Sequence, residues 1–175
     1  MKRNLFIISG SGDTFVWFRM ELISELMNCG YCVFALAPNI SASSKQTLSD
    51  QGVEFLQIGM QRKSFDILNF VTAFFEIIKI YWRYKPEIVL PYMHKPILLS
   101  SLAAIFFPKI KVYPMITGLG HLFERQSLKF TLIRSFMLIF FKLAFFKASK
   151  VFFQNPDDLE LFLQRYSLLS KKKCV

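Results

Sequence analysis

The stretch LFIISGSGDTFVWFRMELISELMNCGYCVFALAP, residues 5–38, decides the fold class. It opens with an apolar run, Leu5–Ser9, which has the length of a buried strand and leads into a glycine loop. A helical pattern follows over Phe15–Asn28, and Tyr31–Ala37 forms a second apolar run that stops at a proline. Because two buried strands joined by a helix make a parallel βαβ unit, this stretch predicts a parallel α/β sheet.

The same alternation of short apolar runs and longer helical patterns continues along the chain. Further strands are expected at Val53–Ile58, Glu87–Tyr92, Lys111–Ile116 and Lys150–Gln154. Further helices are expected within 41–51, from Asp66 to just before Pro86, at Pro96–Phe107, at Leu128–Ser149 and from Pro156 to about Arg165. Six strands alternating with six helices predict a doubly wound parallel sheet of the Rossmann-like type, in one domain over residues 1–165.

The helix expected before Pro86 has the clearest pattern. Its polar residues recur every three or four positions and predict one solvent-facing stripe: Asp66, Asn69, Thr72, Glu76, Lys79 and Arg83. Apolar and aromatic residues are expected to cover the rest of the helix: Phe70, Phe74, Ile77, Ile78 and Tyr81. The helix must end before the proline, because the residue preceding a proline avoids the α region.

Composition supports a folded domain with a negatively charged partner. The chain has 175 residues, of which 53% are hydrophobic, and a formal net charge of +10. The charge is uneven, because eight basic residues and a single acid, Glu124, lie between Lys109 and Lys150. The apolar content excludes a disordered chain, and the second half of the protein is expected to meet the partner that attracts positive charge.

The N-terminus and the cysteines predict a cytoplasmic protein without a metal or redox centre. The apolar run after Lys2 and Arg3 is only Leu5–Ile8, which is too short for a signal peptide. Three cysteines do not make a disulfide framework. Cys29 and Cys32 form a CxxC pair, but they follow a helix C-terminus, where the dipole does not favour a thiolate, and no second pair completes a zinc site.

The glycine loop after the first strand is a candidate ligand site. Gly10, Ser11 and Gly12 would let backbone N–H groups approach an anion or a sugar at a helix N-terminus. A dinucleotide site would need a third glycine where Phe15 stands and an acid at the end of the second strand, which ends Ala35-Leu36-Ala37. We therefore expect no cofactor, and a tight turn without a ligand remains the alternative.

The two histidines follow the fourth and fifth expected strands. Open α/β sheets bind ligands at the carboxyl ends of their strands, so His94 and His121 are candidates for a general base or for a hydrogen bond to a sugar hydroxyl. A loop histidine without a chemical role is the alternative for each. Two histidines do not build a catalytic triad or a metal cluster.

The helix expected at Leu128–Ser149 is apolar, aromatic-rich and basic. Its charges interrupt every run that approaches the about 20 residues needed to span a bilayer. Such a helix can lie on an anionic membrane surface, with Lys129, Arg134, Lys142 and Lys147 as the contacts. A core helix with a charged rim is the alternative. Nucleic acid is not expected, because the aromatic residues lie within hydrophobic runs and no nucleic-acid motif is present.

Several stretches together resemble the N-terminal domain of glycosyltransferase family 4, in particular bacterial enzymes that build capsule, O-antigen and related surface polysaccharides. The likeness keeps its order along essentially the whole chain. Its residues are Phe18-Arg19, Lys85-Pro86-Glu87-Ile88-Val89, Lys95-Pro96, Ser101-Leu102-Ala103-Ala104, Ile116-Thr117-Gly118-Leu119-Gly120, and Val151-Phe152-Phe153-Gln154-Asn155-Pro156-Asp157-Asp158 with Leu161-Phe162. One departure is His121, which stands where the family has an aromatic residue.

The resemblance implies one half of a GT-B fold, in which two Rossmann-like domains face each other across a cleft. In that family the N-terminal domain holds the acceptor, the C-terminal domain holds the nucleotide-sugar donor, and transfer retains the anomeric configuration without a metal. Acceptors in these pathways are often undecaprenyl-linked sugars, so the resemblance implies a peripheral position on the inner face of the cytoplasmic membrane. Residues 166–175 would begin the linker toward a donor domain beyond Val175.

On this reading the chain is the acceptor-binding half of a retaining glycosyltransferase and is inactive alone, with no residue assigned as a nucleophile. The backbone at Gly10, Ser11 and Gly12 would approach the transferred sugar. The acceptor side would be lined by His94, Lys95, Thr117, Gly118 and His121. The alternatives are a non-catalytic membrane-docking or binding subunit that needs a partner chain, and an inactive truncated fragment.

Overall fold

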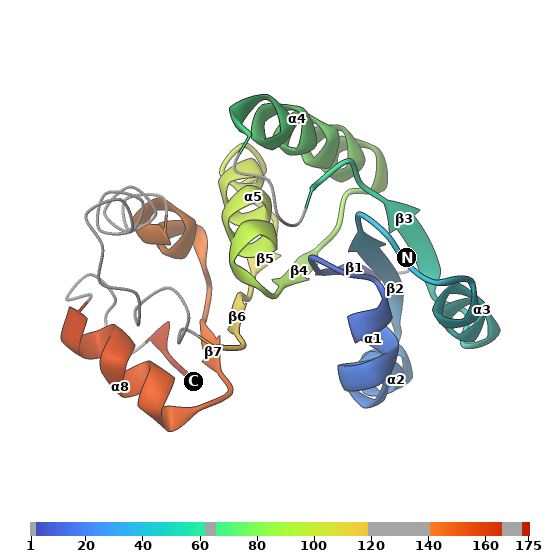
Figure 1. Cartoon of the computed structure of the whole chain (residues 1–175), viewed down its shortest axis with the longest axis horizontal. Coiled ribbons are helices and arrows are strands. Elements are labelled where there is room, and N and C mark those ends of the chain that lie inside the picture. The colour runs from blue at the N-terminus through green and yellow to red at the C-terminus, as the bar shows by residue number, and fades with distance from the viewer. Residues whose placement is uncertain (1–2, 62–65, 119–140, 166–172) are drawn as a thin grey trace.

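The computed structural model describes residues 3–61, 66–118, 141–165 and 173–175. Its centre is a five-stranded parallel sheet with the strand order β3-β2-β1-β4-β5 (Figure 1). The strands are β1 (Arg3–Ile8), β2 (Tyr31–Ala37), β3 (Glu54–Gln57), β4 (Ile88–Pro91) and β5 (Lys111–Val112). A two-stranded parallel sheet follows, with β6 (Met115–Ile116) beside β7 (Phe152–Phe153).

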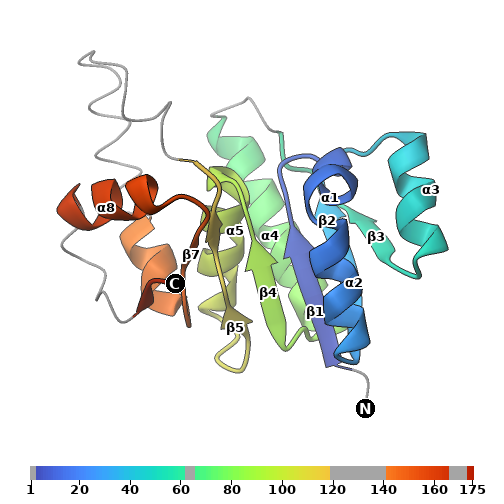
Figure 2. The same cartoon turned by 90° about the horizontal axis from the view of Figure 1, so that it is seen from below.

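The helices cover both faces of the large sheet, so the predicted doubly wound architecture is confirmed. The helices are α1 (Asp13–Phe18), α2 (Met20–Asn28), α3 (Ala42–Asp50), α4 (Ile67–Tyr84), α5 (His94–Ala104) and α8 (Pro156–Arg165), and residues 141–147 are also helical. Figure 2 shows α4 and α5 behind the strands and α1 and α2 in front of them.

Strand alternation explains the two faces. In β1, Phe6 and Ile8 point into the core beneath α4 and α5, where Ile77 of α4 is fully buried. Leu5 and Ile7 point into the opposite core beneath α1, α2 and α3. Successive side chains of a strand point to opposite faces, and a strand that is apolar at every position is therefore covered on both sides.

The predicted single sheet of six strands is wrong in one respect. The run expected as one strand, Lys111–Ile116, is divided into β5 and β6 around Pro114. Proline has no N–H to donate to a ladder, which interrupts the pairing there. β6 then pairs with β7 and stays beside the end of β4 through a parallel bridge between Tyr92 and Met115.

The predicted helix Phe15–Asn28 is also two helices rather than one. The break lies at Arg19, whose backbone angles of φ −131° and ψ 3° are outside the helical region. Polar periodicity continues through Glu21 and Glu25 of α2, so the pattern in the sequence did not reveal the break. At this break the Arg19 guanidinium lies over the ring of Tyr92, 5.0 Å from its centroid.

The remaining helices agree better with the sequence. Asp66 caps α4 by accepting a hydrogen bond from the Leu68 N–H at 3.0 Å, and the helix ends at Tyr84, with Lys85 as its C-cap directly before Pro86. The C-terminal segment forms a third core, in which Phe141, Phe145 and Phe162 pack against the start of α5. Residues 173–175 pair with the chain next to β7, because the Phe153 N–H donates to the Val175 carbonyl oxygen at 2.9 Å.

Candidate functional site

The carboxyl edge of the sheet brings most of the predicted site residues to one place. The strand order reverses between β1 and β4, and open α/β sheets bind ligands in the crevice outside such a point. Residues 10–12 follow β1, His94 and Lys95 follow β4, and Thr117 and Gly118 follow β6. His121 lies outside the described residues, as do Lys129 and Arg134 of the predicted membrane contact.

The glycine loop after β1 is closed by its own hydrogen bonds. The Gly12 N–H donates to the Asn39 carbonyl oxygen at 2.7 Å, and the Ser11 N–H donates to Ser9 Oγ at 3.2 Å. A Cβ atom at Gly12 would lie 2.6 Å from both the Asn39 oxygen and Ile40 Cβ, so close packing against the loop after β2 requires this glycine. The Gly12 N–H is therefore already used within the fold.

A buried hydroxyl network joins the end of β1 to the end of β4. Thr14 Oγ1 donates to the Ser11 carbonyl oxygen at 2.6 Å, which uses its only proton. The Tyr92 hydroxyl, at 2.7 Å, therefore donates to Thr14 Oγ1, while Ser9 Oγ lies 2.9 Å from Thr14 Oγ1 and 3.7 Å from Met93 Sδ. Burial raises the pKa of the Tyr92 phenol, which keeps it protonated for this role.

Met93, between this network and His94, has an unusual backbone. Its φ is 66° and its ψ is 151°, a combination that only glycine adopts without strain. Met93 is also the N-cap of α5, and its carbonyl oxygen accepts the Ile97 N–H at 3.1 Å. Residues held in such conformations concentrate at functional sites, where the surrounding structure maintains them. The junction of β4 and α5 therefore has a feature typical of a binding site.

His94 is a half-buried imidazole at the first position of α5. Its ring lies 5.9 Å from the ring of Phe141, measured between centroids. Burial lowers the pKa of His94, and the carboxylate of Asp158 opposes that shift. The imidazole is therefore neutral at pH 7 and can accept a hydrogen bond from a hydroxyl group.

Lys95 is engaged with the protein itself. Its ammonium donates to the Gln61 carbonyl oxygen at 2.7 Å and to Asn69 Oδ1 at 3.2 Å. Burial lowers the pKa of Lys95, and the carboxylate of Asp66 opposes that shift. The side chain thus ties α5 to the loop after β3, and its predicted contact with an acceptor stays a prediction.

The other predicted residues differ in how accessible they are. Thr117 is exposed. Gly118 has a φ of 145°, which favours glycine, whereas a Cβ added there would have no atom within 4 Å. The backbone conformation, and not close packing, therefore explains this glycine. Lys142 is exposed. The Lys147 ammonium instead donates to the carbonyl oxygens of Phe107 at 3.4 Å and Pro108 at 3.2 Å, so it faces the protein.

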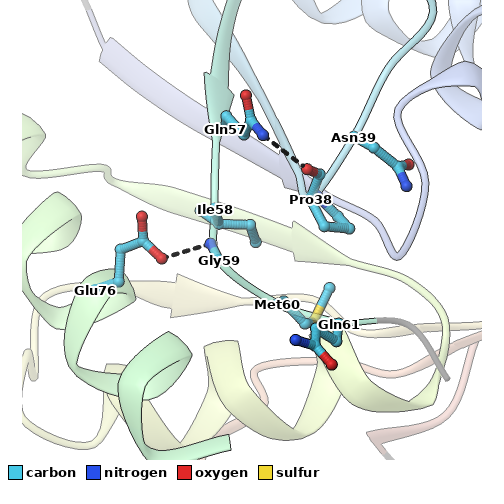
Figure 3. A pocket seen from close by; sticks show the side chains of 8 residues that line it. All are labelled: Pro38, Asn39, Gln57, Ile58, Gly59, Met60, Gln61 and Glu76. Carbon is cyan, nitrogen blue, oxygen red and sulfur yellow. Dashed lines mark hydrogen bonds between the residues drawn. The ribbon is translucent and has the colours of Figure 1, made fainter. Parts of the chain in front are cut away.

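An open hollow of about 830 Å³ lies at the carboxyl ends of β2 and β3 (Figure 3). It is lined by Pro38, Asn39, Gln57, Ile58, Gly59, Met60, Gln61 and Glu76. Glu76 accepts the Gly59 N–H at 2.6 Å, and Gln57 Nε2 donates to the Pro38 carbonyl oxygen at 3.1 Å. Amides and a carboxylate of this kind suit sugar hydroxyls, which both donate and accept hydrogen bonds.

The sequence did not predict this hollow or the hydroxyl network. The hollow is formed by two loops and a helix whose lining residues are 15 to 38 positions apart in the chain and meet only in the fold. Ser9 and Tyr92 had one usable signal, their places at the ends of apolar strands. Within the described ranges, no group of three or more His, Cys, Asp and Glu side chains could hold a metal ion. No helix in these ranges is long and apolar enough to cross a bilayer.

Comparison with known proteins gives the family and the fold. A family model described as "Glycosyl transferase 4-like" matches residues 6–155. The chain is 26% identical over 168 residues to the N,N'-diacetylbacillosaminyl-diphospho-undecaprenol alpha-1,3-N-acetylgalactosaminyltransferase of Campylobacter jejuni. That alignment covers 96% of this chain and 44% of the relative, so the chain spans less than half of the relative's length.

Solved structures share the fold at lower identity. A glycosyltransferase from Rickettsia africae has a TM-score of 0.68 at 16% identity, covering 99% of this chain and 42% of that one. A UDP-GlcNAc 2-epimerase from Methanocaldococcus jannaschii has a TM-score of 0.62 at 15% identity, covering 99% of this chain and 44% of that one. The same fold thus serves two different reactions, and the fold alone does not select one of them.

Proposed function

The chain belongs to the glycosyl transferase 4-like family, and we propose that it is the acceptor-side domain of a glycosyltransferase. The complete enzyme would transfer a sugar from a nucleotide-sugar to a lipid-linked saccharide during synthesis of a cell-surface polysaccharide. The name of the Campylobacter relative supports the lipid-linked acceptor, because that protein's acceptor is a diphospho-undecaprenol sugar. Retention of the anomeric configuration is part of the same proposal and follows the family resemblance.

One observation carries the acceptor role: the described carboxyl edge offers hydroxyls, amides and a neutral imidazole rather than an anion site. The Gly12 N–H is bonded to Asn39, and α1 has only 6 residues, so its N-terminus is a poor cradle for a diphosphate. The Lys95 ammonium is bonded to Gln61 and Asn69. This edge suits the saccharide part of the acceptor, whereas a diphosphate, whether of the nucleotide or of the lipid carrier, would need cationic contacts beyond these residues.

His94 would hold a hydroxyl of the acceptor saccharide. As a neutral imidazole it can accept the hydroxyl's proton in a hydrogen bond, which orients the oxygen toward the donor sugar. Thr117 and the backbone at Gly118 would line the same side, next to β6. The hollow beside Asn39, Gln61 and Glu76 would receive further sugar units.

The test is binding by residues 1–175 of two probes in separate titrations. The first is N,N'-diacetylbacillosamine on a diphosphate with a shortened, water-soluble prenyl chain, and the second is a UDP-linked N-acetylhexosamine. We expect the first probe to bind and the second not to bind. Binding of only the UDP-sugar would overturn the acceptor role, and binding of neither probe would overturn the proposed acceptor class.

Variants place the binding at the proposed site. His94→Gln should weaken binding of the acceptor probe, since the glutamine amide cannot reproduce the imidazole's position. Ser49→Ala is the matched control, because Ser49 is exposed near the end of α3, at the opposite edge of the sheet. Equal effects of the two substitutions would place the binding site elsewhere.

A further inference from the structure

The outer face of α4 is apolar although it faces solvent. This 18-residue helix buries Ala73, Ile77 and Tyr81 against the sheet and lies on the outside of the molecule (Figure 1). On its other side Leu68 is 75% exposed and Trp82 is 74% exposed. Exposed apolar residues are ordinary one at a time, but a contiguous group marks an interaction surface.

The exposed apolar residues form one strip. Leu68, Val71, Phe75 and Trp82 are spaced by three, four and seven residues, which puts them on one side of an α-helix. The strip continues onto the turn after α5, since Phe74 contacts both Phe75 and the exposed Phe106 through its ring. We call these five exposed residues, Leu68, Val71, Phe75, Trp82 and Phe106, the α4 strip.

Basic residues accompany the strip. Lys79 and Arg83 are exposed on the next row of the helix, and Lys85 and Lys109 are exposed at the ends of α4 and of the loop after α5. The two acids of this segment both accept backbone N–H groups. Asp66 caps the helix, and the Glu76 carboxylate accepts the Gly59 N–H in the loop after β3. The surface is therefore apolar with a positive rim.

We propose that the α4 strip docks on the surface of an anionic phospholipid bilayer. Its apolar side chains would enter the boundary between headgroups and acyl chains, and Lys79 and Arg83 would meet lipid phosphates. An amphipathic helix with aromatic residues on one side and cations beside them binds membrane surfaces in this way. The inference rests on the proposed function in one respect, because a lipid-linked acceptor gives the domain a reason to meet a bilayer.

The position of the strip suits delivery of such an acceptor. Asn69, in the first turn of α4, accepts the Gln61 N–H at 2.9 Å and donates to the Gly59 carbonyl oxygen at 2.8 Å. The helix end that carries Leu68 is therefore fixed beside the hollow of Figure 3. Docking through the end of α4 that carries Leu68 would bring this hollow close to the lipid headgroups.

This surface differs from the basic helix that the sequence singled out. α5 lies between α4 and the helical residues 141–147 in both overall views. Phe106 belongs to the α4 strip, whereas Phe141 and Phe145 of the other helix pack into the third core. The two surfaces can therefore be tested separately.

The two tryptophans of the chain allow a direct experiment. Trp17→Phe leaves Trp82 as the sole reporter within the strip, and Trp82→Phe leaves Trp17, which is 66% exposed on α1. Each variant is titrated with phosphatidylcholine vesicles with and without phosphatidylglycerol. We expect Trp82 emission to shift to shorter wavelength and to be quenched by brominated acyl chains in anionic vesicles, whereas Trp17 emission stays unchanged. An unchanged Trp82, or an equal response of Trp17, would overturn the proposal.

Charge variants provide a second, independent readout. Lys79→Gln with Arg83→Gln should weaken co-sedimentation with anionic vesicles by about thirtyfold. The matched control also removes two charges, by Lys45→Gln on α3 and Lys142→Gln on the basic helix, both at exposed positions. A loss in the control equal to or larger than that of the Lys79 and Arg83 variant would overturn the proposal. The vesicles contain no saccharide, so failure here leaves the acceptor titration as an independent test of the proposed function.

Discussion

The loop after β1 and the loop after β4 meet at one edge of the sheet, yet their residues are used differently. The first loop carries the glycines, and its N–H groups at Ser11 and Gly12 are bonded to Ser9 and Asn39. In the second loop, the backbone of Met93 has a conformation that favours glycine, and the half-buried His94 follows it. The glycine-rich loop therefore serves packing through these N–H groups, whereas features typical of a binding site lie after β4.

The substitution Gly12→Ala tests the packing role of the loop after β1 and has the largest expected effect. The added Cβ would lie 2.6 Å from the Asn39 oxygen and from Ile40 Cβ, and the backbone oxygen cannot move without disturbing β2. Overpacking of this kind lowers the free energy of unfolding by about 3 kcal/mol. Chemical denaturation measures the effect. Ser11→Ala, in the same loop but half-exposed, should change the value by less than about 0.5 kcal/mol.

A Gly12→Ala variant that is as stable as the parent chain would contradict the packing role, and the loop would again be a candidate ligand site. The acceptor titration provides a second test of the same loop. Provided the variant folds, loss of acceptor binding at unchanged stability would mean that the backbone at Gly12 touches the ligand after all.

The second prediction concerns the strain at Met93. Met93→Ala removes the side-chain contacts and keeps the strained φ, whereas Met93→Gly removes the same contacts and relieves the strain. The glycine variant should therefore be more stable than the alanine variant by about 1 kcal/mol, measured as the free energy of unfolding. The order is reversed in an ordinary helix, so Ser49→Gly in α3 should be less stable than Ser49→Ala.

The same pair of variants tests whether the strain has a use. If Met93 positions His94 for the acceptor, Met93→Gly should weaken binding of the acceptor probe while it raises stability relative to Met93→Ala. An alanine variant that is the more stable of the two would show that the backbone at this position is not under strain.

The sequence predicted what depends on local patterns. Fully apolar runs at β1 and β2 identified strands covered on both faces, and the bounds expected for Tyr31–Ala37 agree with the structure. Pro86 and Asp66 marked the limits of α4. The carboxyl edge of a parallel sheet then brought Gly10 and His94 to one place through topology alone.

The remaining features depend on contacts between distant residues. The hydrogen bond between Thr14 and Tyr92 joins residues 78 positions apart, and no local pattern in the sequence predicts it. The sequence did not predict the α4 strip for a different reason. The polar stripe of this helix is real, but Phe75 and Trp82 lie beside it, and only the fold shows which apolar residues the sheet leaves uncovered.

The smallest expected effect is the pH dependence that His94 contributes. Burial lowers its pKa in the folded state, so the unfolded chain binds a proton more readily than the folded chain. The free energy of unfolding should therefore fall as the pH decreases below about 6.5, the ordinary pKa of histidine, and His94 should contribute nothing above it. Denaturation of the parent chain and of His94→Gln at pH 7.5 and at about pH 5.5 measures this, and the slope should be shallower in the variant. His121→Gln is the matched control for the other histidine. A variant slope equal to that of the parent would contradict the lowering of the His94 pKa by burial.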